Sequence, residues 1–248
     1  MDKTVLPRAL SLQGASNVRD LGGWPVPDGR RVRFGLVFRA ASLSDLTDAD
    51  IVALAATGLR TVCDLRGEVE QQQAPSRLPG VVTHALSIEP SLGASLHDLV
   101  ARREATGEDV MVLMRRAYTA YALDWSHRYR ALFDLLLQDD APPLLFHCTA
   151  GKDRTGFGAA LLLAALGADE DVVLEDYLAT NRLWRGDPAF QSTLPEAVAE
   201  VLLRVHPELI VTAFDAIRGA HGNLETYLEH RIGLDPARRA ALQARLLE

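Results

Sequence analysis

Residues 142–166 read PPLLFHCTAGKDRTGFGAALLLAAL, and this stretch decides the fold that we expect. The apolar run Pro142 to Phe146 predicts a short buried strand, and the run from Gly156 to Leu166 predicts a buried helix. A short loop of mostly small and polar residues joins them. A strand, a tight loop and a helix N-terminus together form an anion-binding site, because unpaired backbone N–H groups and the positive end of the helix dipole point into the loop.

The loop contains one cysteine, Cys148, which lies six residues before Arg154. A free thiol has a pKa of about 8.5, and helix N-termini and neighbouring cations lower it. Lys152 and Arg154 supply the cations here, and the hydroxyl of Thr155 is expected to donate a hydrogen bond to the sulfur. We therefore expect Cys148 to be a nucleophilic thiolate.

The same loop has the composition of a phosphate-binding loop. Small residues allow the backbone to curl around phosphate oxygens, and an arginine can hold a phosphate through two hydrogen bonds. In the reaction that follows, Cys148 attacks phosphorus to form a phosphocysteine, which water hydrolyses. A Walker A loop is excluded, because it needs serine or threonine directly after its lysine. The expected phosphate-binding residues are Thr149, Ala150, Gly151, Lys152, Asp153 and Arg154.

Composition and charge narrow the class of protein. The chain has 248 residues, of which 48% are hydrophobic and 24% are charged, as in ordinary globular proteins. A formal net charge of −7 argues against a partner that is a nucleic acid. The two cysteines, Cys63 and Cys148, predict no disulfide framework and favour a reducing compartment such as the cytoplasm. We find no secretory signal and no apolar run long enough for stable insertion in a membrane, although export without such a signal stays open.

The order of predicted elements indicates an α/β fold with a mainly parallel sheet. A turn at Asp28-Gly29 predicts an N-terminal hairpin, in which Arg19 and Asp20 form a pair. From Asp169 onward the pattern is almost wholly helical. The expected strands cover residues 37–39, 59–65, 81–86 and 144–147, and the expected helices cover residues 47–58, 108–138, 156–166 and 169–184.

The string from His147 to Gly156 resembles the signature of the bacterial atypical branch of cysteine-based protein tyrosine phosphatases, which act on phosphotyrosine and phosphoinositides. The resemblance extends to the segments NVRDLGG at residues 17–23 and DLR at residues 64–66, followed by Glu70. Residues 177–181 and 222–233 also resemble blocks of that branch. The resemblance therefore covers nearly the whole chain.

This resemblance implies a tyrosine-phosphatase-like sheet flanked by helices, with a helical C-terminal part. It implies a single phosphatase domain over residues 1–248, in which residues 169–222 either pack on the sheet or form a helical lid. The expected substrates are phosphotyrosine, phosphoserine or phosphothreonine in proteins, and phosphoinositides, with inorganic phosphate as the product and no metal or cofactor. A non-catalytic phosphate-binding module and a phosphatase restricted to inositol lipids are the alternative hypotheses.

Two aspartates are candidates for the acid that protonates the leaving group. Asp153 lies inside the loop, where the resembling branch is thought to place its acid. Asp64 ends a predicted strand, at the edge of the sheet where α/β proteins bind ligands, and it could orient Arg154 instead. We favour Asp153. Asp28, near Trp24-Pro25, is instead explained by the hairpin turn.

Other residues have supporting roles in this interpretation. Lys152 could select substrates with an extra phosphate, or it could simply add to the attraction of phosphate. His147 is expected to order the loop through a hydrogen bond. Arg66 and Glu70 could line the rim of the site or form a structural ion pair. Cys63 could protect Cys148 in a disulfide, but alternation along its strand argues against this if Asp64 faces the site.

Overall fold

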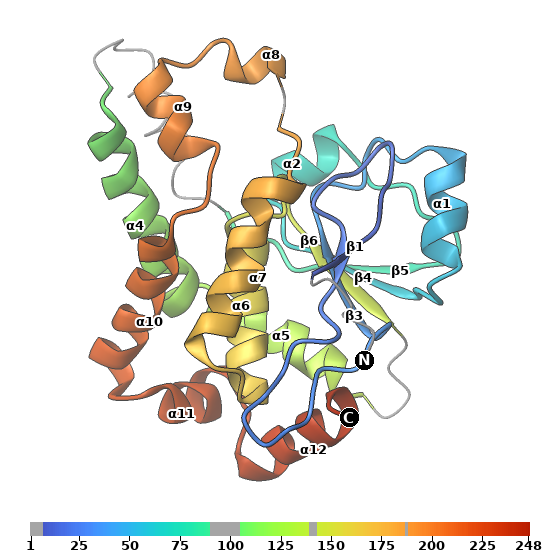
Figure 1. Ribbon diagram of the computed structural model, residues 1–248, viewed down its shortest axis with the longest axis vertical. Helices are drawn as coiled ribbons and strands as arrows, with labels where there is room; N and C mark the ends of the chain where they lie inside the picture. Colours follow the sequence, from blue (N-terminus) through green and yellow to red (C-terminus); the bar gives the residue numbers. More distant parts are fainter. Residues whose placement is uncertain (1–6, 90–104, 139–142, 187) are drawn as a thin grey trace.

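The computed structural model describes residues 7–89, 105–138, 143–186 and 188–248. In these residues one mixed sheet carries helices on both faces (Figure 1). The strand order is β1-β2-β3-β6-β4-β5; β3, β6, β4 and β5 are parallel, and β1 and β2 extend the sheet in antiparallel fashion. The expected α/β fold with a mainly parallel sheet is confirmed. The strands are β1 (Arg8–Ala9), β2 (Arg19–Asp20), β3 (Val37–Ala40), β4 (Thr61–Asp64), β5 (Val82–Ala85) and β6 (Leu144–His147).

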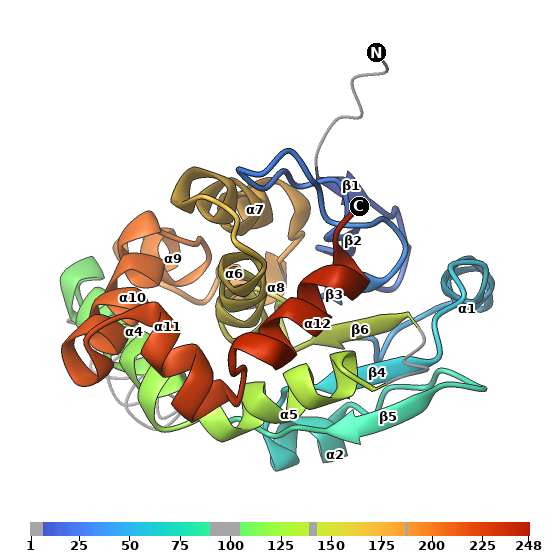
Figure 2. The ribbon, with the colours of Figure 1, turned by 90° about the horizontal axis from the view of Figure 1, so that it is seen from below.

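Helices make up most of the rest of the described chain, and Figure 2 shows α5, α6 and α12 beside the sheet with α4, α10 and α11 farther out. No helix in the described ranges is long and apolar enough to cross a membrane. The helices are α1 (Asp48–Ala55), α2 (Glu68–Gln73), α4 (Gly107–Leu123), α5 (Ser126–Leu136), α6 (Arg154–Leu166), α7 (Glu170–Leu183), α8 (Pro188–Gln191), α9 (Glu196–Leu202), α10 (Pro207–His221), α11 (Leu224–Tyr227), the π-helix η1 (Leu228–Ile232) and α12 (Pro236–Leu246).

The central strands are buried on both faces because their side chains alternate between two cores. Leu145 of β6 and Val62 of β4 pack with α1 and the N-terminal segment. Phe146 and Cys63 point to the opposite side and join the larger core, which includes residues of α4, α5, α6 and α7. β6 therefore lies in the middle of the molecule, and the loop that follows it is held on a rigid base.

Helix α6 directly follows this loop and is buried along almost its whole length. It ends at Gly167, whose φ of 98° is the left-handed conformation that glycine adopts readily at helix ends. Helix α1 begins at a capping box in which Thr47 and Asp50 exchange hydrogen bonds with each other's backbone N–H groups, as its sequence predicts.

The single long helix expected over residues 108–138 is wrong. The structure has two helices, α4 and α5, which are separated at Asp124 and Trp125. The two halves pack against different partners: α4 lies against α9 and α10, whereas α5 lies against η1. An uninterrupted helix could not direct one apolar stripe toward both sets of partners.

Residues 169–222, where a lid was considered, contain the helices α7 to α10, with Asp187 outside the described residues. Helix α7 is anchored in the core by Tyr177, and α10 by Leu209. Helix α9 packs closely on α4: a Cβ atom at Gly107 would lie 3.0 Å from the carbonyl oxygen of Ala197. The movement of any part of this segment as a lid stays a prediction.

Candidate active site

The loop at residues 148–153 lies at the carboxyl end of β6 and leads into the N-terminus of α6. Cys148 is only 2% exposed and forms no disulfide. Within the described part of the chain, the backbone N–H groups of residues 149–153 donate no hydrogen bond to another protein group. A cysteine, unpaired N–H groups and a helix N-terminus are thus brought together, as the sequence predicts, in an arrangement that binds anions.

The loop keeps this shape because its carbonyl groups are bound from outside. The side-chain amide of Asn17 donates to the carbonyls of Ala150 at 3.3 Å and Gly151 at 2.8 Å. Arg39 donates a second hydrogen bond to Gly151, at 2.8 Å. Gly151 has a φ of 63°, and a Cβ atom there would lie 2.3 Å from the carbonyl oxygen of Ala40. Glycine is required at this position on both grounds.

Two fully buried arginines share one carboxylate beside the loop. Asp176 of α7 accepts hydrogen bonds from Arg19 at 2.9 Å and from Arg39 at 2.6 Å. Burial and the neighbouring charge of Arg39 lower the pKa of Arg19 to about 10. Two cations and one carboxylate give this cluster a net positive charge, which favours an anion in the adjacent loop.

The expected pair of Arg19 with Asp20 is wrong, because Asp20 instead accepts hydrogen bonds from backbone N–H groups of the N-terminal segment.

Arg154 is held at one end of its guanidinium by Glu70 of α2. Nη1 lies 2.6 Å from Oε2 of Glu70, and Nη2 lies 2.9 Å from Oε1. The remaining hydrogens of these two nitrogens point to the carbonyl of Ile88, at 3.2 Å, and the hydroxyl of Thr149, at 3.3 Å. Thr149 also donates to Glu70. The edge formed by Nε and Nη2 is therefore the one at which a phosphate can bind. A phosphate bound there replaces the hydroxyl of Thr149 as the acceptor at Nη2.

Both members of this pair are charged. Burial by itself raises the pKa of Glu70, but hydrogen bonds from Arg154 and Thr149 outweigh it and lower the pKa to about 2. Burial by itself lowers the pKa of Arg154, while the hydrogen bonds to Glu70 outweigh this and raise it above its ordinary value. Arg66 and Glu70, considered together as an ion pair, are not partners: each binds a different residue.

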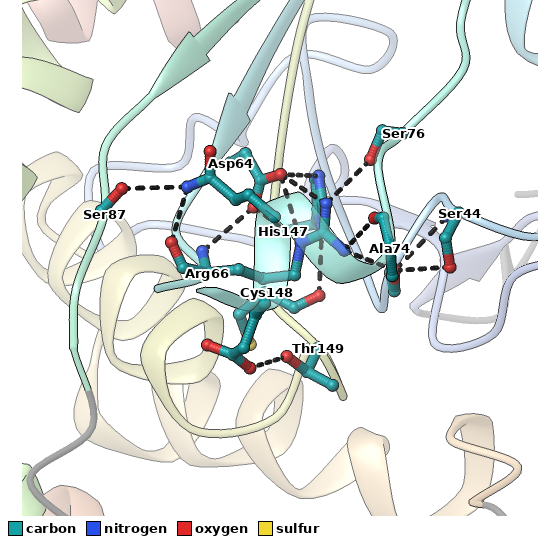
Figure 3. Close-up of polar contacts among 12 residues, drawn as sticks. Ser44, Asp64, Arg66, Ala74, Ser76, Ser87, His147, Cys148 and Thr149 are labelled. Atoms are coloured by element: carbon teal, nitrogen blue, oxygen red, sulfur yellow. Dashed lines mark hydrogen bonds and ion pairs between the residues drawn. The ribbon is translucent and has the colours of Figure 1, made fainter. Parts of the chain in front are cut away.

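Arg66 binds Asp64 and is the centre of a buried hydrogen-bonding network (Figure 3). Its Nε and Nη2 donate to Asp64 at 3.0 and 2.7 Å. Its other hydrogens reach the carbonyl of Ala74 and the hydroxyls of Ser42 and Ser76. Every N–H of Arg66 is thereby engaged, so its role is to fix the loops around the site.

Asp64 is a fixed carboxylate. Burial raises its pKa, but the hydrogen bonds from Arg66 outweigh this and hold the pKa below its ordinary value. Nε2 of His147 lies 3.7 Å from Asp64, and Nδ1 lies 3.1 Å from the carbonyl oxygen of Cys148. Burial lowers the pKa of His147, which is therefore neutral at neutral pH. It contacts the carbonyl of Cys148, and its role in ordering the loop stays a prediction.

Asp153 has a different environment. Its Oδ1 accepts hydrogen bonds from the hydroxyl of Tyr118 and from Nζ of Lys152, both at 2.9 Å. Its side chain is 20% exposed, whereas that of Asp64 is 4% exposed. Lys152 donates in addition to the carbonyl of Arg204, at 3.1 Å, and is itself buried. Of the two candidate acids, Asp153 is the one that solvent or a substrate can reach.

Two further expectations concern the sulfur. The hydroxyl of Thr155 has no hydrogen-bonding partner among the described residues, so the expected hydrogen bond to Cys148 is not formed. Cys63 is completely buried beside Phe146 of the neighbouring strand, and burial raises the pKa of its thiol to about 12. A thiol of this kind is a poor partner for a protective disulfide, because exchange requires the thiolate.

Several residues of the site were not predicted from the sequence. They are Asn17 and Arg39, which hold the loop carbonyls, and Asp176, which neutralises part of the buried charge. Tyr118 was also missed, since a tyrosine at helical spacing predicts only a core position. Asn17 and Tyr177 do lie in the segments that resemble the phosphatase branch, and that was the available signal.

Comparisons with known proteins find several relatives of this chain. A family model described as the tyrosine phosphatase family matches residues 10–248. A Cupriavidus necator protein, classed provisionally as a tyrosine-protein phosphatase, is 33% identical over 93% of this chain and 89% of its own length. The triple specificity protein phosphatase PtpB of Mycobacterium tuberculosis is 34% identical over 68% of each chain. The crystal structure of Pseudomonas aeruginosa TpbA aligns with a TM-score of 0.37 and 15% identity, over 86% of this chain and 99% of that one.

Proposed function

This chain belongs to the tyrosine phosphatase family and is a protein-tyrosine phosphatase, and on that premise we propose that Cys148, Arg154 and Asp153 carry its reaction. Cys148 is the nucleophile, Arg154 is the phosphate clamp and Asp153 is the general acid. The observation that carries the proposal is the position of Cys148 at the start of a loop whose N–H groups donate no hydrogen bond to any residue that the structure describes.

In the first step, the sulfur of Cys148 attacks phosphorus while the bond from phosphorus to the leaving oxygen breaks. The N–H groups of the loop and the Nε–Nη2 edge of Arg154 bind the phosphoryl oxygens, on which negative charge is spread in the transition state. Asp153 gives its proton to the leaving oxygen. In the second step, water attacks the phosphocysteine and releases inorganic phosphate.

The assignment of the acid to Asp153 rests on accessibility and on which carboxyl oxygens already accept hydrogen bonds. Arg66 engages both oxygens of Asp64. Glu70 is bound in the same way by Arg154. A carboxylate whose two oxygens both accept hydrogen bonds from one arginine, and whose pKa is lowered by them, is a poor proton donor near neutral pH. Asp153 differs from both, because only its Oδ1 accepts hydrogen bonds from the described residues and its Oδ2 accepts none.

Hydrolysis of aryl phosphates by the wild type and by Cys148→Ser tests the nucleophile. We expect Cys148→Ser to lose activity and keep its fold and its affinity for phosphate. Activity retained by Cys148→Ser would refute the proposal, and a wild type that binds phosphate without hydrolysing it would support the alternative of a binding module.

A series of aryl phosphates with different leaving groups tests the acid. In Asp153→Asn, kcat should fall most for the leaving group with the highest pKa, because that group needs protonation most. In Asp64→Asn the loss should be similar for all leaving groups, since that change disturbs the loops through Arg66. The opposite pattern would assign the acid to Asp64.

We further propose that phosphoinositides, and phosphoserine or phosphothreonine, are additional substrates. The name of the mycobacterial relative, a triple specificity phosphatase, supports this, as does the cation at position 152. Lys152 uses two of its hydrogens on Asp153 and Arg204, which leaves one for a second phosphate. Lys152→Ala should therefore lower kcat/KM for phosphoinositides more than for a phosphotyrosine peptide. Equal losses would limit Lys152 to general attraction of phosphate.

A further inference from the structure

Two buried tyrosines form a chain of hydrogen bonds that ends on Asp153. Tyr118 of α4 and Tyr177 of α7 have no exposed surface, and their hydroxyl oxygens are 2.6 Å apart. The hydroxyl of Tyr118 also lies 2.9 Å from Oδ1 of Asp153. The rings meet edge to face, with centroids 6.3 Å apart, so that both phenols are held by packing as well as by hydrogen bonds.

The direction of each hydrogen bond in this chain is determined by chemistry. An ionised carboxylate can only accept hydrogen bonds, so the single hydroxyl hydrogen of Tyr118 goes to Asp153. The hydroxyl of Tyr177 must then donate to Tyr118. Burial raises the pKa of both tyrosines well above the ordinary value, so both stay neutral and keep their hydrogens.

This chain distinguishes the two oxygens of Asp153. Oδ1 already accepts hydrogen bonds from Tyr118 and Lys152. Oδ2 accepts none from the described residues, so a proton on the carboxyl group belongs on Oδ2. A carboxyl group that is held at one oxygen and protonated at the other has the arrangement that a general acid needs.

We propose that Tyr118 and Tyr177 are positioning residues of the phosphatase reaction, which hold Asp153 so that Oδ2 presents its proton to the leaving oxygen. The inference rests on the proposed role of Asp153 as general acid. Tyr118 acts directly on the carboxyl group, whereas Tyr177 acts through Tyr118. The two tyrosines also connect α4 and α7 to the phosphate loop, so the aspartate is held by two helices of the core.

The role predicts a change in pH dependence that a purely structural role does not. A hydrogen bond from Tyr118 favours the ionised form of the carboxyl group that accepts it, and Tyr118→Phe removes that bond. The alkaline limb of the kcat profile should therefore move to higher pH. In Tyr177→Phe the bond from Tyr118 remains, and the shift should be smaller. Tyr227→Phe is the matched control: its hydroxyl is buried and donates to the carbonyl of Ala122, away from the loop.

The test measures kcat for aryl phosphates with leaving groups of high and low pKa, together with pH profiles, in these variants and in Asp153→Asn. We expect Tyr118→Phe to lower kcat by about tenfold for the poor leaving group, a part of the effect of general acid catalysis, and by less for the good one. In the Asp153→Asn background, Tyr118→Phe should cause no further loss selective for the poor leaving group.

Failure of the inference and failure of the proposed function give different results. If Asp153→Asn shows the leaving-group dependence but Tyr118→Phe lowers kcat equally for all substrates and leaves the profile in place, the positioning role is overturned. If Asp153→Asn shows no such dependence, Asp153 is not the general acid, and the inference about the tyrosines is refuted as well. Should Tyr118→Phe not fold, the milder Tyr177→Phe decides: an unshifted profile and equal losses overturn the proposal.

Discussion

Glu70 and Arg154 face each other end to end: Oε2 and Oε1 of the carboxylate lie 2.6 and 2.9 Å from Nη1 and Nη2 of the guanidinium. The two residues are far apart in the sequence, and α2 and the phosphate loop bring them together. The pair reserves one edge of Arg154 for Glu70 and leaves the Nε–Nη2 edge for a phosphate. The orientation of the Arg154 guanidinium is therefore set by a residue outside the loop.

Substitution of Glu70 should disturb this orientation. In Glu70→Gln one carboxylate oxygen becomes an NH₂ group, which repels the guanidinium that it faces. We expect kcat/KM for a phosphotyrosine peptide to fall about 10- to 100-fold, the size of effect that small misplacements of catalytic groups produce. Glu89→Gln is a suitable control, because Glu89 accepts a hydrogen bond from the backbone of Glu68 on the same helix. An equal loss in both variants would contradict the prediction.

The same pair predicts a dependence of stability on pH. The pKa of Glu70 is lowered from 4.5 to about 2, so its ionised form stabilises the folded state fully above pH 4.5. That contribution is lost as the pH falls from 4.5 toward 2. The difference in Tm between the wild type and Glu70→Gln should thus be constant above about pH 5 and shrink below it. A difference that stays constant down to pH 3 would show that the pair adds no pH-dependent stability.

Asp176 balances part of the positive charge of two buried arginines, and its substitution should lower the stability of the fold. Asp176→Asn leaves Arg19 and Arg39 buried without a counter-charge, and we expect a loss of about 3–5 kcal/mol in the free energy of unfolding. Asp215→Asn breaks an exposed pair with Arg218 and should cost about 0–1 kcal/mol. Chemical denaturation of both variants measures the two changes in the free energy of unfolding. Changes of similar size would mean that burial does not make the Asp176 cluster more important for stability than an exposed ion pair.

Gly151 tests how closely the phosphate loop approaches β3. Gly151→Ala introduces a Cβ atom 2.3 Å from the carbonyl oxygen of Ala40, in a left-handed conformation. Gly29 has a φ of 87° with open space around it, so Gly29→Ala carries the conformational cost alone, about 1–2 kcal/mol. We expect Gly151→Ala to lose more stability than this and also most of its affinity for phosphate. Calorimetric titration with inorganic phosphate measures the second effect, and equal stability losses in both variants would argue against a close approach.

Local chemistry was sufficient to predict the strand, loop and helix over residues 144–166. Residues 144–147 are apolar and β-forming, residues 148–153 are small or charged, and residues from Gly156 onward are apolar over several helical turns. A strand, an anion-binding loop and a helix follow from these properties because they depend on neighbours in the sequence. The break between α4 and α5 does not, because it depends on which partners each half packs against.

The sequence by itself determined that this chain places a cysteine and an arginine at the two ends of one anion-binding loop, since six residues of spacing and small side chains suffice for that. Only the tertiary structure decided what surrounds the loop: Glu70 on Arg154, Arg66 on Asp64, Arg39 on Gly151, and Tyr118 on Asp153. Charged and hydrogen-bonding side chains have many possible partners along a chain. Which partner each one meets is settled when the strands and helices pack and bury them together.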